Sequence, residues 1–343
     1  MNSSATGRLA VKERLARLVE SWAEVSLTVI GDAVLDEFEF GEIARVSREA
    51  PVLILDHRRS DLVPGGAGNT AANLAAIDVR VLLVGRVGDD PRGHQLAELL
   101  ARRGVDVSGL IFDSRYPTPT KTRILAGSPH TAKQQIVRID RGRRAIGLAA
   151  DARRQLLSHA RRARKAGSAV LLADYGYGLV DPGWIEELGS GPGPITLDSR
   201  FGLERFRGID AATPNLEEVE RALDTPLDDD DEVSIERAGR ALRRRLGAQA
   251  LLVTRGSRGM TLLENRRPAQ KIAVFGSDEV ADVTGAGDTV IAVFTTARAA
   301  GGSWREAAEL ANIAGGLVVM KRGTATVSRE ELLEALEEWS GSN

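Results

Sequence analysis

Residues 282–288 read Asp-Val-Thr-Gly-Ala-Gly-Asp and open an apolar run that ends near Gly301. The glycines allow a tight turn that points backbone N–H groups outward at a helix start, where unpaired donors and the helix dipole hold anions. Asp288 adds a carboxylate to the same place. This pairing suits phosphoryl transfer, because the N–H groups neutralise phosphate charge while the carboxylate deprotonates a hydroxyl. The alternative interpretation is an ordinary glycine turn in which Asp288 only stabilises the helix.

Short runs rich in leucine or β-branched residues alternate with longer helical patterns around this motif. Such alternation is typical of a parallel sheet with helices on both faces, so we expect an α/β fold in which residues 1–343 form one domain. A helical face made of Val11, Leu15, Leu18 and Trp22 predicts a docked N-terminal helix. The predicted strands are 27–30, 81–84, 169–173, 194–197 and 250–253, and the further predicted helices are 67–76, 92–103, 151–165, 216–223, 233–246, 286–300, 304–320 and 329–339.

Two stretches, residues 38–63 and 119–139, interrupt this rhythm because neither has helical periodicity. The first contains Pro51-Val52-Leu53-Ile54-Leu55, and the second has two strand-like runs around Gly127-Ser128-Pro129-His130. We expect both stretches to form antiparallel strands near the front of the sheet, where they would make a small β lid.

The composition excludes several classes of protein. Hydrophobic residues make up 43% and charged residues 27%, which provides a sizeable core and argues against disorder. A net charge of −2 and only 4% aromatic residues indicate no nucleic-acid partner. The lack of cysteine excludes a disulfide framework and a cysteine nucleophile. Since we find neither a membrane-spanning apolar run nor a signal peptide, we expect a cytoplasmic protein with no membrane partner.

Two charged runs receive structural interpretations. Residues 228–232 are interpreted as an acidic loop that leads into a helix, where carboxylates complement the helix dipole. Residues 161–165 are interpreted as the solvated end of a helix. The four histidines lack the spacing of metal ligands, so we expect no zinc site.

A second motif, Thr213-Pro214-Asn215-Leu216-Glu217-Glu218, lies where a strand ends and a helix begins. Asn215 and Glu218 are three residues apart, so both can face one site from the first helical turn. An amide and a carboxylate placed in this way could organise Mg²⁺ through water. The alternative is a capping box, in which the glutamate reaches back to the helix cap.

A third motif, residues 64–73, is rich in glycine and asparagine. Gly66, Gly68 and Ala71 match the G-x-G-x-x-A dinucleotide pattern, and Asp89 follows about twenty residues later, as a ribose ligand should. However, the residues before the motif lack the tight strand-to-turn entry of a dinucleotide-binding fold. Close approach of the backbone to a polyhydroxyl ligand, with Asn69 as a bidentate hydrogen-bonding group, explains the glycines as well. A Walker A sequence is absent.

Taken in order, the three motifs resemble the ribokinase-like, PfkB-type family of sugar kinases. That family's Gly-Gly motif corresponds to Gly65-Gly66, its Asn-x-x-Glu element to Asn215 and Glu218, and its C-terminal glycine motif to residues 282–288. The resemblance implies a ribokinase-like three-layer α/β/α sandwich with a mostly parallel central sheet and a small β-sheet lid. It also implies an ATP- and Mg²⁺-dependent phosphotransferase with a sugar alcohol group as acceptor, and a homodimer paired through the lid.

Further segments resemble the D-glycero-β-D-manno-heptose 7-phosphate kinases of lipopolysaccharide biosynthesis. The chain departs from that subfamily at Tyr177 and Arg200, each of which replaces a lysine. The expected reaction is phosphorylation of the anomeric O1 to give the 1,7-bisphosphate, without a fused nucleotidyltransferase. The alternatives are another sugar or nucleoside kinase, an NAD-dependent oxidoreductase and a non-catalytic sensor. The segments that carry this resemblance are 31–36, 45–52, 119–123, 213–215 and 323–328.

The resemblance implies a role for each matching residue. Asp288 would be the catalytic base, and the anion hole would consist of Gly285, Ala286 and Gly287. The substrate would be bound by Asp36, Gly65, Gly66, Asn69, Lys121, Arg123 and Arg138. The nucleotide would contact Asn215, Glu218, Thr254, Arg255, Gly256, Gly259 and Asn312. Mg²⁺ would be held through water by Glu218, and a monovalent cation such as K⁺ would lie near Asp282 and Thr284.

Overall fold

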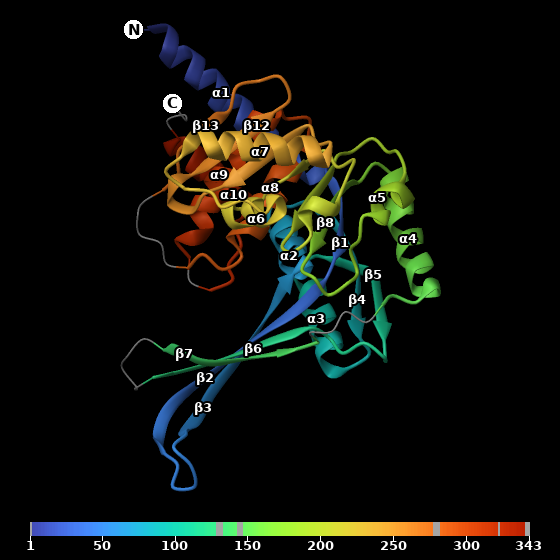
Figure 1. Ribbon diagram of the computed structural model, residues 1–343, viewed down its shortest axis with the longest axis vertical. Coiled ribbons are helices and arrows are strands. Elements are labelled where there is room, and N and C mark those ends of the chain that lie inside the picture. The colour runs from blue at the N-terminus through green and yellow to red at the C-terminus, as the bar shows by residue number, and fades with distance from the viewer. Residues whose placement is uncertain (1, 128–132, 143–146, 277–281, 322, 340–343) are drawn as a thin grey trace.

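The computed structural model describes residues 2–127, 133–142, 147–276, 282–321 and 323–339. Within these ranges the chain forms a nine-stranded central sheet with strand order β13-β12-β11-β10-β9-β8-β1-β4-β5 (Figure 1). The strands from β11 to β5 pair in parallel, whereas β12 and β13 add an antiparallel edge. The strand bounds are β1 Ser26–Gly31, β4 Arg80–Gly88, β5 Asp106–Asp113, β8 Ala169–Asp174, β9 Ile195–Ser199, β10 Ala211–Ala212, β11 Ala250–Thr254, β12 Met260–Glu264 and β13 Gln270–Ile272.

Helices cover both faces of this sheet, and two hydrophobic clusters separate the layers. In β8, Leu171 belongs to one cluster, while its neighbours Val170 and Leu172 belong to the other, as the period of a strand requires. The predicted three-layer sandwich is therefore confirmed. One face carries α1 Asn2–Glu20, α2 Ala67–Ala76, α3 Pro91–Arg102, α8 Ala286–Ala299, α9 Trp304–Val319 and α10 Arg329–Glu338, and the other carries α4 Ala150–Lys165, α5 Gly183–Leu188, α6 Leu216–Leu223 and α7 Glu232–Leu246.

A second, four-stranded sheet projects from one end of this body (Figure 1). Its order is β3-β2-β6-β7, with bounds β2 Ala33–Val46, β3 Leu53–Gly66, β6 Thr120–Gly127 and β7 Gln134–Arg141. The two predicted strand pairs exist, but the prediction of purely antiparallel pairing is wrong, because β2 and β6 pair in parallel. Both strands follow parallel strands of the central sheet, β1 and β5, and so leave its edge in the same direction. The segment Gly127-Ser128-Pro129-His130, around which the two strand-like runs were predicted, lies mostly outside the described residues.

The predicted elements of the central body are confirmed to within two residues at each end, except that β4 extends to Gly88, four residues beyond the predicted end. Leu15, Leu18 and Trp22 of the N-terminal segment are buried as expected, whereas Val11 is exposed. The expectation of a solvated helix end at residues 161–165 is wrong for Arg164, which is buried and donates to the carbonyls of Gly189 and Gly193. Among the described helices, none combines the length and apolarity that a bilayer crossing demands.

Candidate active site

A cavity of about 630 Å³ opens where the second sheet leaves the carboxyl ends of the central strands. In open α/β sheets this edge is where ligands bind. The cavity collects residues from all three sequence motifs. Of the predicted site residues, its lining contains Asp36, Gly65, Gly66, Asn69, Lys121, Arg123, Arg138, Asn215, Glu218, Thr254, Thr284, Gly285, Gly287 and Asp288.

Asp288 is the buried centre of this cavity and lies in the first turn of α8. Its Oδ2 atom accepts a hydrogen bond of 2.6 Å from Asn69 Nδ2. Its Oδ1 atom accepts one of 3.0 Å from Thr70 Oγ1 and another from the Tyr175 hydroxyl. Burial raises the pKa of Asp288, while these three donors act to lower it. The carboxylate is thus held in one orientation by groups from two other elements.

A second layer of hydrogen bonds fixes Asn69 itself. Thr289 donates to Asn73 Oδ1 over 2.7 Å, and Asn73 Nδ2 donates to the Asn69 carbonyl over 2.9 Å. Asn69, Asn73 and Thr289 are all buried. Since Asn69 and Asn73 belong to α2 and Thr289 to α8, the two glycine-bearing motifs are joined by a buried polar seam.

Two glycines are required by close approaches at this seam. A Cβ atom on Gly65 would lie 2.2 Å from Asp36 Oδ2, so glycine lets the Asp36 carboxylate lie against the backbone. Gly285 has a φ of +82°, and a Cβ there would lie 2.7 Å from Asn69 Nδ2. Left-handed backbone is unfavourable for residues that carry a Cβ, so both conformation and space favour glycine at position 285.

The cationic side chains of the cavity differ in how far they are neutralised. Arg123 forms an ion pair of 2.6 Å with Asp36, and Arg138 forms one of 2.8 Å with Asp140. In the described part of the chain, Lys121 Nζ and the Arg200 guanidinium have no ion pair or hydrogen bond. Burial lowers the pKa of Lys121. A half-buried ammonium without a bound partner is suited to an anionic ligand.

Asn215 and Glu218 form the capping box that was one of the two interpretations of their motif. Asn215 Oδ1 accepts from the Glu218 N–H, and Glu218 Oε2 accepts from the Asn215 N–H, each over 2.9 Å. The Glu218 side chain also reaches the cavity, and burial raises its pKa. One carboxylate oxygen therefore caps α6, which leaves the other for a ligand.

A second cavity, of about 430 Å³, adjoins the first and shares Thr254, Val283 and Gly287 with it. Its wall is mainly apolar and comes from β12, α8, α9 and the segment after β13. The amide Nδ2 of Asn312 donates to the Ala273 carbonyl over 2.9 Å. The predicted nucleotide residues Thr254, Gly256, Gly259 and Asn312 line this cavity, as do Ala286 and Gly287.

Arg255, which was predicted to contact the nucleotide, is not among the residues that line either cavity. Its buried guanidinium pairs with Asp229 over 3.0 Å and with Glu232 over 2.8 Å. Within the acidic loop, Asp231 caps α7 as expected. The loop therefore also holds the segment after β11 through ion pairs, which charge spacing alone did not predict.

This arrangement predicts a stabilising role for Arg255. We expect Arg255→Met to lower the free energy of unfolding by about 2 kcal/mol, since it removes charge-assisted hydrogen bonds from a buried group. Arg258→Met is the matched control, because Arg258 pairs with the same loop but is exposed, and its loss should be much smaller. Urea unfolding of both variants measures the difference. Equal losses would contradict the assignment.

The cation site predicted near Asp282 and Thr284 is only partly assembled. Asp282 Oδ1 accepts a 2.9 Å hydrogen bond from the Thr284 N–H, and of the two residues only Thr284 lines the cavity. No cluster of three or more His, Asp or Glu side chains suited to a metal occurs within the described ranges.

The predicted site residues did not include Asp32, Tyr175, Asp198 or Arg200. Asp32 accepts hydrogen bonds from the N–H groups of Tyr175, Tyr177 and Leu179 and so shapes the loop after β8. Burial raises the pKa of Asp32 to about 6. Tyr175 and Asp198 line the cavity. The position of Asp32 directly after β1, at the carboxyl end of a parallel strand, could have indicated a site residue.

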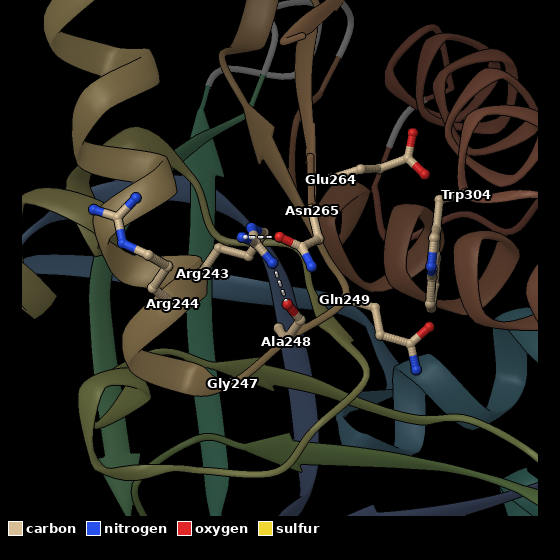
Figure 2. Close-up of a pocket in the computed structure, with 8 residues that line it drawn as sticks. All are labelled: Arg243, Arg244, Gly247, Ala248, Gln249, Glu264, Asn265 and Trp304. Atoms are coloured by element: carbon tan, nitrogen blue, oxygen red, sulfur yellow. Dashed lines mark hydrogen bonds between the residues drawn. The ribbon is translucent and has the colours of Figure 1, made fainter. Parts of the chain in front are cut away.

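A further hollow, of about 510 Å³, lies at the amino end of β11, the opposite end of this strand from Thr254. Figure 2 shows Arg243 directed at the Ala248 carbonyl and Asn265, to which it donates over 2.6 and 3.4 Å, while Arg244 points away. The length of a strand separates this hollow from Asp288, so it takes no part in the chemistry there.

Comparison with known proteins agrees with this geometry. The model of the pfkB family of carbohydrate kinases matches residues 26–173 and 199–331, which is most of the chain. The chain belongs to the pfkB family. The chain is therefore a member of a family of carbohydrate kinases.

Individual relatives and a solved structure show the same similarity. It is 41% identical to the bifunctional protein HldE of Nitrosococcus oceani over 92% of this chain and 64% of that protein. It is 38% identical to the D-beta-D-heptose 7-phosphate kinase of Bordetella bronchiseptica, over 91% of this chain and 96% of that protein. The chain thus spans less than two thirds of the HldE relatives that it matches. Arabidopsis thaliana ribokinase has the same fold, with a TM-score of 0.71 at 22% identity over 91% of this chain and 99% of that chain.

The oxidoreductase alternative does not agree with these findings. Gly66 is the last residue of β3 in the second sheet. Gly68 lies in α2 and packs near Pro64 of β3 and Leu100 of α3. Asp89, the proposed ribose ligand, pairs with His94 over 2.9 Å on the surface. Gly66 instead allows a close approach to the Asp32 carbonyl, and its neighbour Gly65 makes room for the Asp36 carboxylate.

Proposed function

We propose that this kinase phosphorylates D-glycero-β-D-manno-heptose 7-phosphate at the anomeric O1 to give the 1,7-bisphosphate. The observation that carries the proposal is the uncommitted positive charge of Lys121 and Arg200 in a cavity that also contains Asp288. A sugar that already bears a phosphate would satisfy these cations, whereas a neutral sugar would leave them unpaired. The relatives named as heptose 7-phosphate kinases support the same substrate.

Asp288 would act as the base of an in-line transfer. The O1–H bond breaks and its proton moves to Asp288 Oδ2, which accepts only the Asn69 bond and keeps a free lone pair. O1 attacks the γ-phosphorus of ATP as the bond to the ADP oxygen breaks. The N–H groups of Gly285, Ala286 and Gly287 would stabilise charge on the transferring phosphoryl group. Asp36, Gly65, Gly66, Asn69, Arg123 and Arg138 would hold the sugar phosphate together with Lys121 and Arg200.

The adjoining apolar cavity would take the nucleotide base, with Asn312 at its wall and Thr254, Gly256 and Gly259 along the phosphates. Glu218 and Asn215 offer hard oxygen donors, which suit Mg²⁺ held through water. When bound, Mg²⁺ neutralises phosphate charge. The carboxylate of Asp282 and the hydroxyl of Thr284 would suit a monovalent cation such as K⁺ in the same way.

The chain would work as one kinase domain in which residues 38–63 and 119–139 serve as the lid that excludes water. Strands β2, β3 and β7 of the lid sheet expose apolar side chains, which supports pairing of two such sheets in a homodimer. These side chains include Ile43, Val46, Leu53, Ile136, Val137 and Ile139.

The assay that tests the proposal measures ADP release with Mg-ATP. Heptose 7-phosphate is compared with fructose 6-phosphate, fructose, ribose and adenosine. We expect turnover on the heptose phosphate at a kcat/KM far above that of the other acceptors. Preferential turnover on a different acceptor would retain the family's chemistry and overturn the substrate assignment.

We expect Lys121→Met to raise KM for the sugar phosphate about tenfold or more, since a charge-assisted contact to phosphate is removed. KM for ATP should stay near the wild-type value. Lys271→Met is the control, because Lys271 is exposed, pairs with Glu232 and is not among the residues that line either cavity. Steady-state kinetics with both substrates decide the matter. An unchanged KM for the sugar phosphate would mean that its phosphate group does not bind Lys121.

A further inference from the structure

The carboxylate of Asp32 is buried behind the candidate active site and is surrounded by backbone amides. Asp32 follows β1 directly and is 2% exposed. Its Oδ2 atom accepts hydrogen bonds of 3.0 Å from the N–H groups of Tyr175 and Tyr177, and its Oδ1 atom accepts one of 3.2 Å from the N–H group of Leu179. In the part of the chain that the structure describes, Asp32 has no ion pair. The three amides therefore stabilise the buried charge, and the loop cannot move away without leaving that charge unpaired.

The loop after β8 is folded so that these three N–H groups point to one side. The donors alternate with Gly176 and Gly178, which have φ angles of +79° and +89°. Glycine adopts this left-handed backbone readily, so the loop can curl around the carboxylate. The first residue of the loop is Tyr175, whose hydroxyl group donates to Asp288 Oδ1. The grip of Asp32 on the loop thus fixes the backbone from which one donor to Asp288 extends.

The backbone of Asp32 makes a second connection, to the first residue of α2. The Asp32 carbonyl accepts a 3.0 Å hydrogen bond from the Ala67 N–H group. The same helix carries Asn69 and Thr70, which are the other two donors to Asp288. One residue therefore connects both segments that orient the Asp288 carboxylate.

We propose that Asp32 is a positioning residue whose carboxylate acts on the reaction through Tyr175 and Asp288. The carboxylate holds the loop so that the phenol meets Asp288, while the carbonyl holds α2 so that the amide and hydroxyl donors meet the same group. Asp32 is not among the residues that line the cavity. This inference rests on the proposed function, because it takes Asp288 as the base.

Asp32→Asn tests the carboxylate with little change in size. Its NH2 group would face one of the three N–H donors, and a donor cannot replace the lost acceptor. We expect kcat to fall about tenfold to 100-fold, since a displacement near one ångström at the reacting groups has an effect of that order, while KM for ATP stays near the wild-type value. Asp210→Asn is the matched control, because Asp210 accepts a 2.8 Å bond from the Ile195 N–H group at the amino end of β9 and lies outside both cavity linings. Equal kcat values in the two variants would overturn the proposal.

A double-mutant cycle separates positioning from a general loss of structure. If Asp32 acts through Tyr175, then Asp32→Asn should cost little more once Tyr175→Phe has removed the hydroxyl group. Independent effects multiply, so a kcat in the double variant within about twofold of the slower single variant supports the proposal, and a loss equal to the product of the single losses contradicts it. An unchanged kcat in Tyr175→Phe contradicts it as well, because Tyr175 would then transmit nothing to Asp288.

Fluorine NMR of the protein labelled with 3-fluorotyrosine follows Tyr175 without any assay of activity. The chain has three tyrosines, so each resonance can be assigned by replacing one tyrosine at a time with phenylalanine. The Tyr175 resonance should shift in Asp32→Asn and stay in place in Asp210→Asn. If it does not shift in Asp32→Asn, Asp32 does not position Tyr175 and the proposal is wrong.

Gly178→Ala gives the same two readouts if Asp32→Asn does not fold. It strains the left-handed backbone of the loop and leaves the carboxylate in place, so it should also shift the Tyr175 resonance and lower kcat. An unshifted resonance with wild-type kcat would contradict the proposal. If the wild type phosphorylates no sugar at all, the proposed function fails, while the resonance still decides whether Asp32 positions Tyr175.

Discussion

Asp288→Asn is expected to lower kcat about 10³-fold, within the range that a general base contributes. The amide keeps the size of the carboxylate and can still accept from Thr70 and Tyr175, so the fold should persist. It cannot take the proton of the sugar hydroxyl. KM for ATP should therefore change little while turnover almost disappears, and ADP release under saturating substrates measures the loss.

The matched control for this variant is Asp89→Asn. Asp89 is exposed, pairs with His94 on the surface and lies outside the cavity lining. It should keep wild-type kinetics, which also tests the rejected dinucleotide interpretation. If Asp288→Asn retained most of the wild-type kcat, Asp288 would only orient the substrate. Calorimetric titration of Asp288→Asn with ATP separates loss of chemistry from loss of structure, because an unfolded variant would not bind the nucleotide tightly.

The pH dependence follows from the same carboxylate. Burial raises the pKa of Asp288, and a base must be ionised to act. The acid limb of kcat should accordingly lie above the pH at which an ordinary aspartate titrates. A profile that stays flat down to the range of exposed carboxyl groups would argue that another group accepts the proton.

The glycine motifs predicted the site because glycine is required where the backbone closely approaches another group. Gly285 and Gly65 occupy positions where a Cβ would collide with Asn69 and Asp36, so a chain that keeps this site must keep glycine there. Periodicity also predicted most of the long elements of the central body, although the eight-residue strand β5 was not predicted. The two-residue strand β10 and the short β13 have too few residues to show any period, and they were not predicted.

Partners that come from distant strands could not be predicted in the same way. Asn69 and Asp288 are separated by 219 positions, and Tyr175 and Asp288 by 113. Nothing local in the sequence says that these side chains meet. The ion pairs of Arg255 are a related case. The sequence shows an arginine beside a glycine turn, but it does not show that Asp229 and Glu232 bind its guanidinium. The parallel pairing of β2 with β6 likewise follows from where each strand leaves the central sheet.

Gly285→Ala is expected to lower kcat about 100-fold, because a displacement near one ångström at the reacting groups has an effect of that order. The new methyl group would lie 2.7 Å from Asn69 Nδ2 and would push the amide away from Asp288 Oδ2. The left-handed backbone at φ +82° should also cost about 1 kcal/mol of stability once a Cβ is present.

Gly104→Ala separates these two effects. Gly104 has a φ of +83°, nearly the same as Gly285, but a Cβ there would have no neighbour within 4 Å. It lies just after α3, outside the lining of both cavities near Asp288. Both variants should therefore lose similar stability in urea unfolding, while only Gly285→Ala loses turnover. Equal kinetics in the two variants would mean that the Asn69 contact with Asp288 does not govern the rate, because backbone strain is common to both and the collision with Asn69 is not.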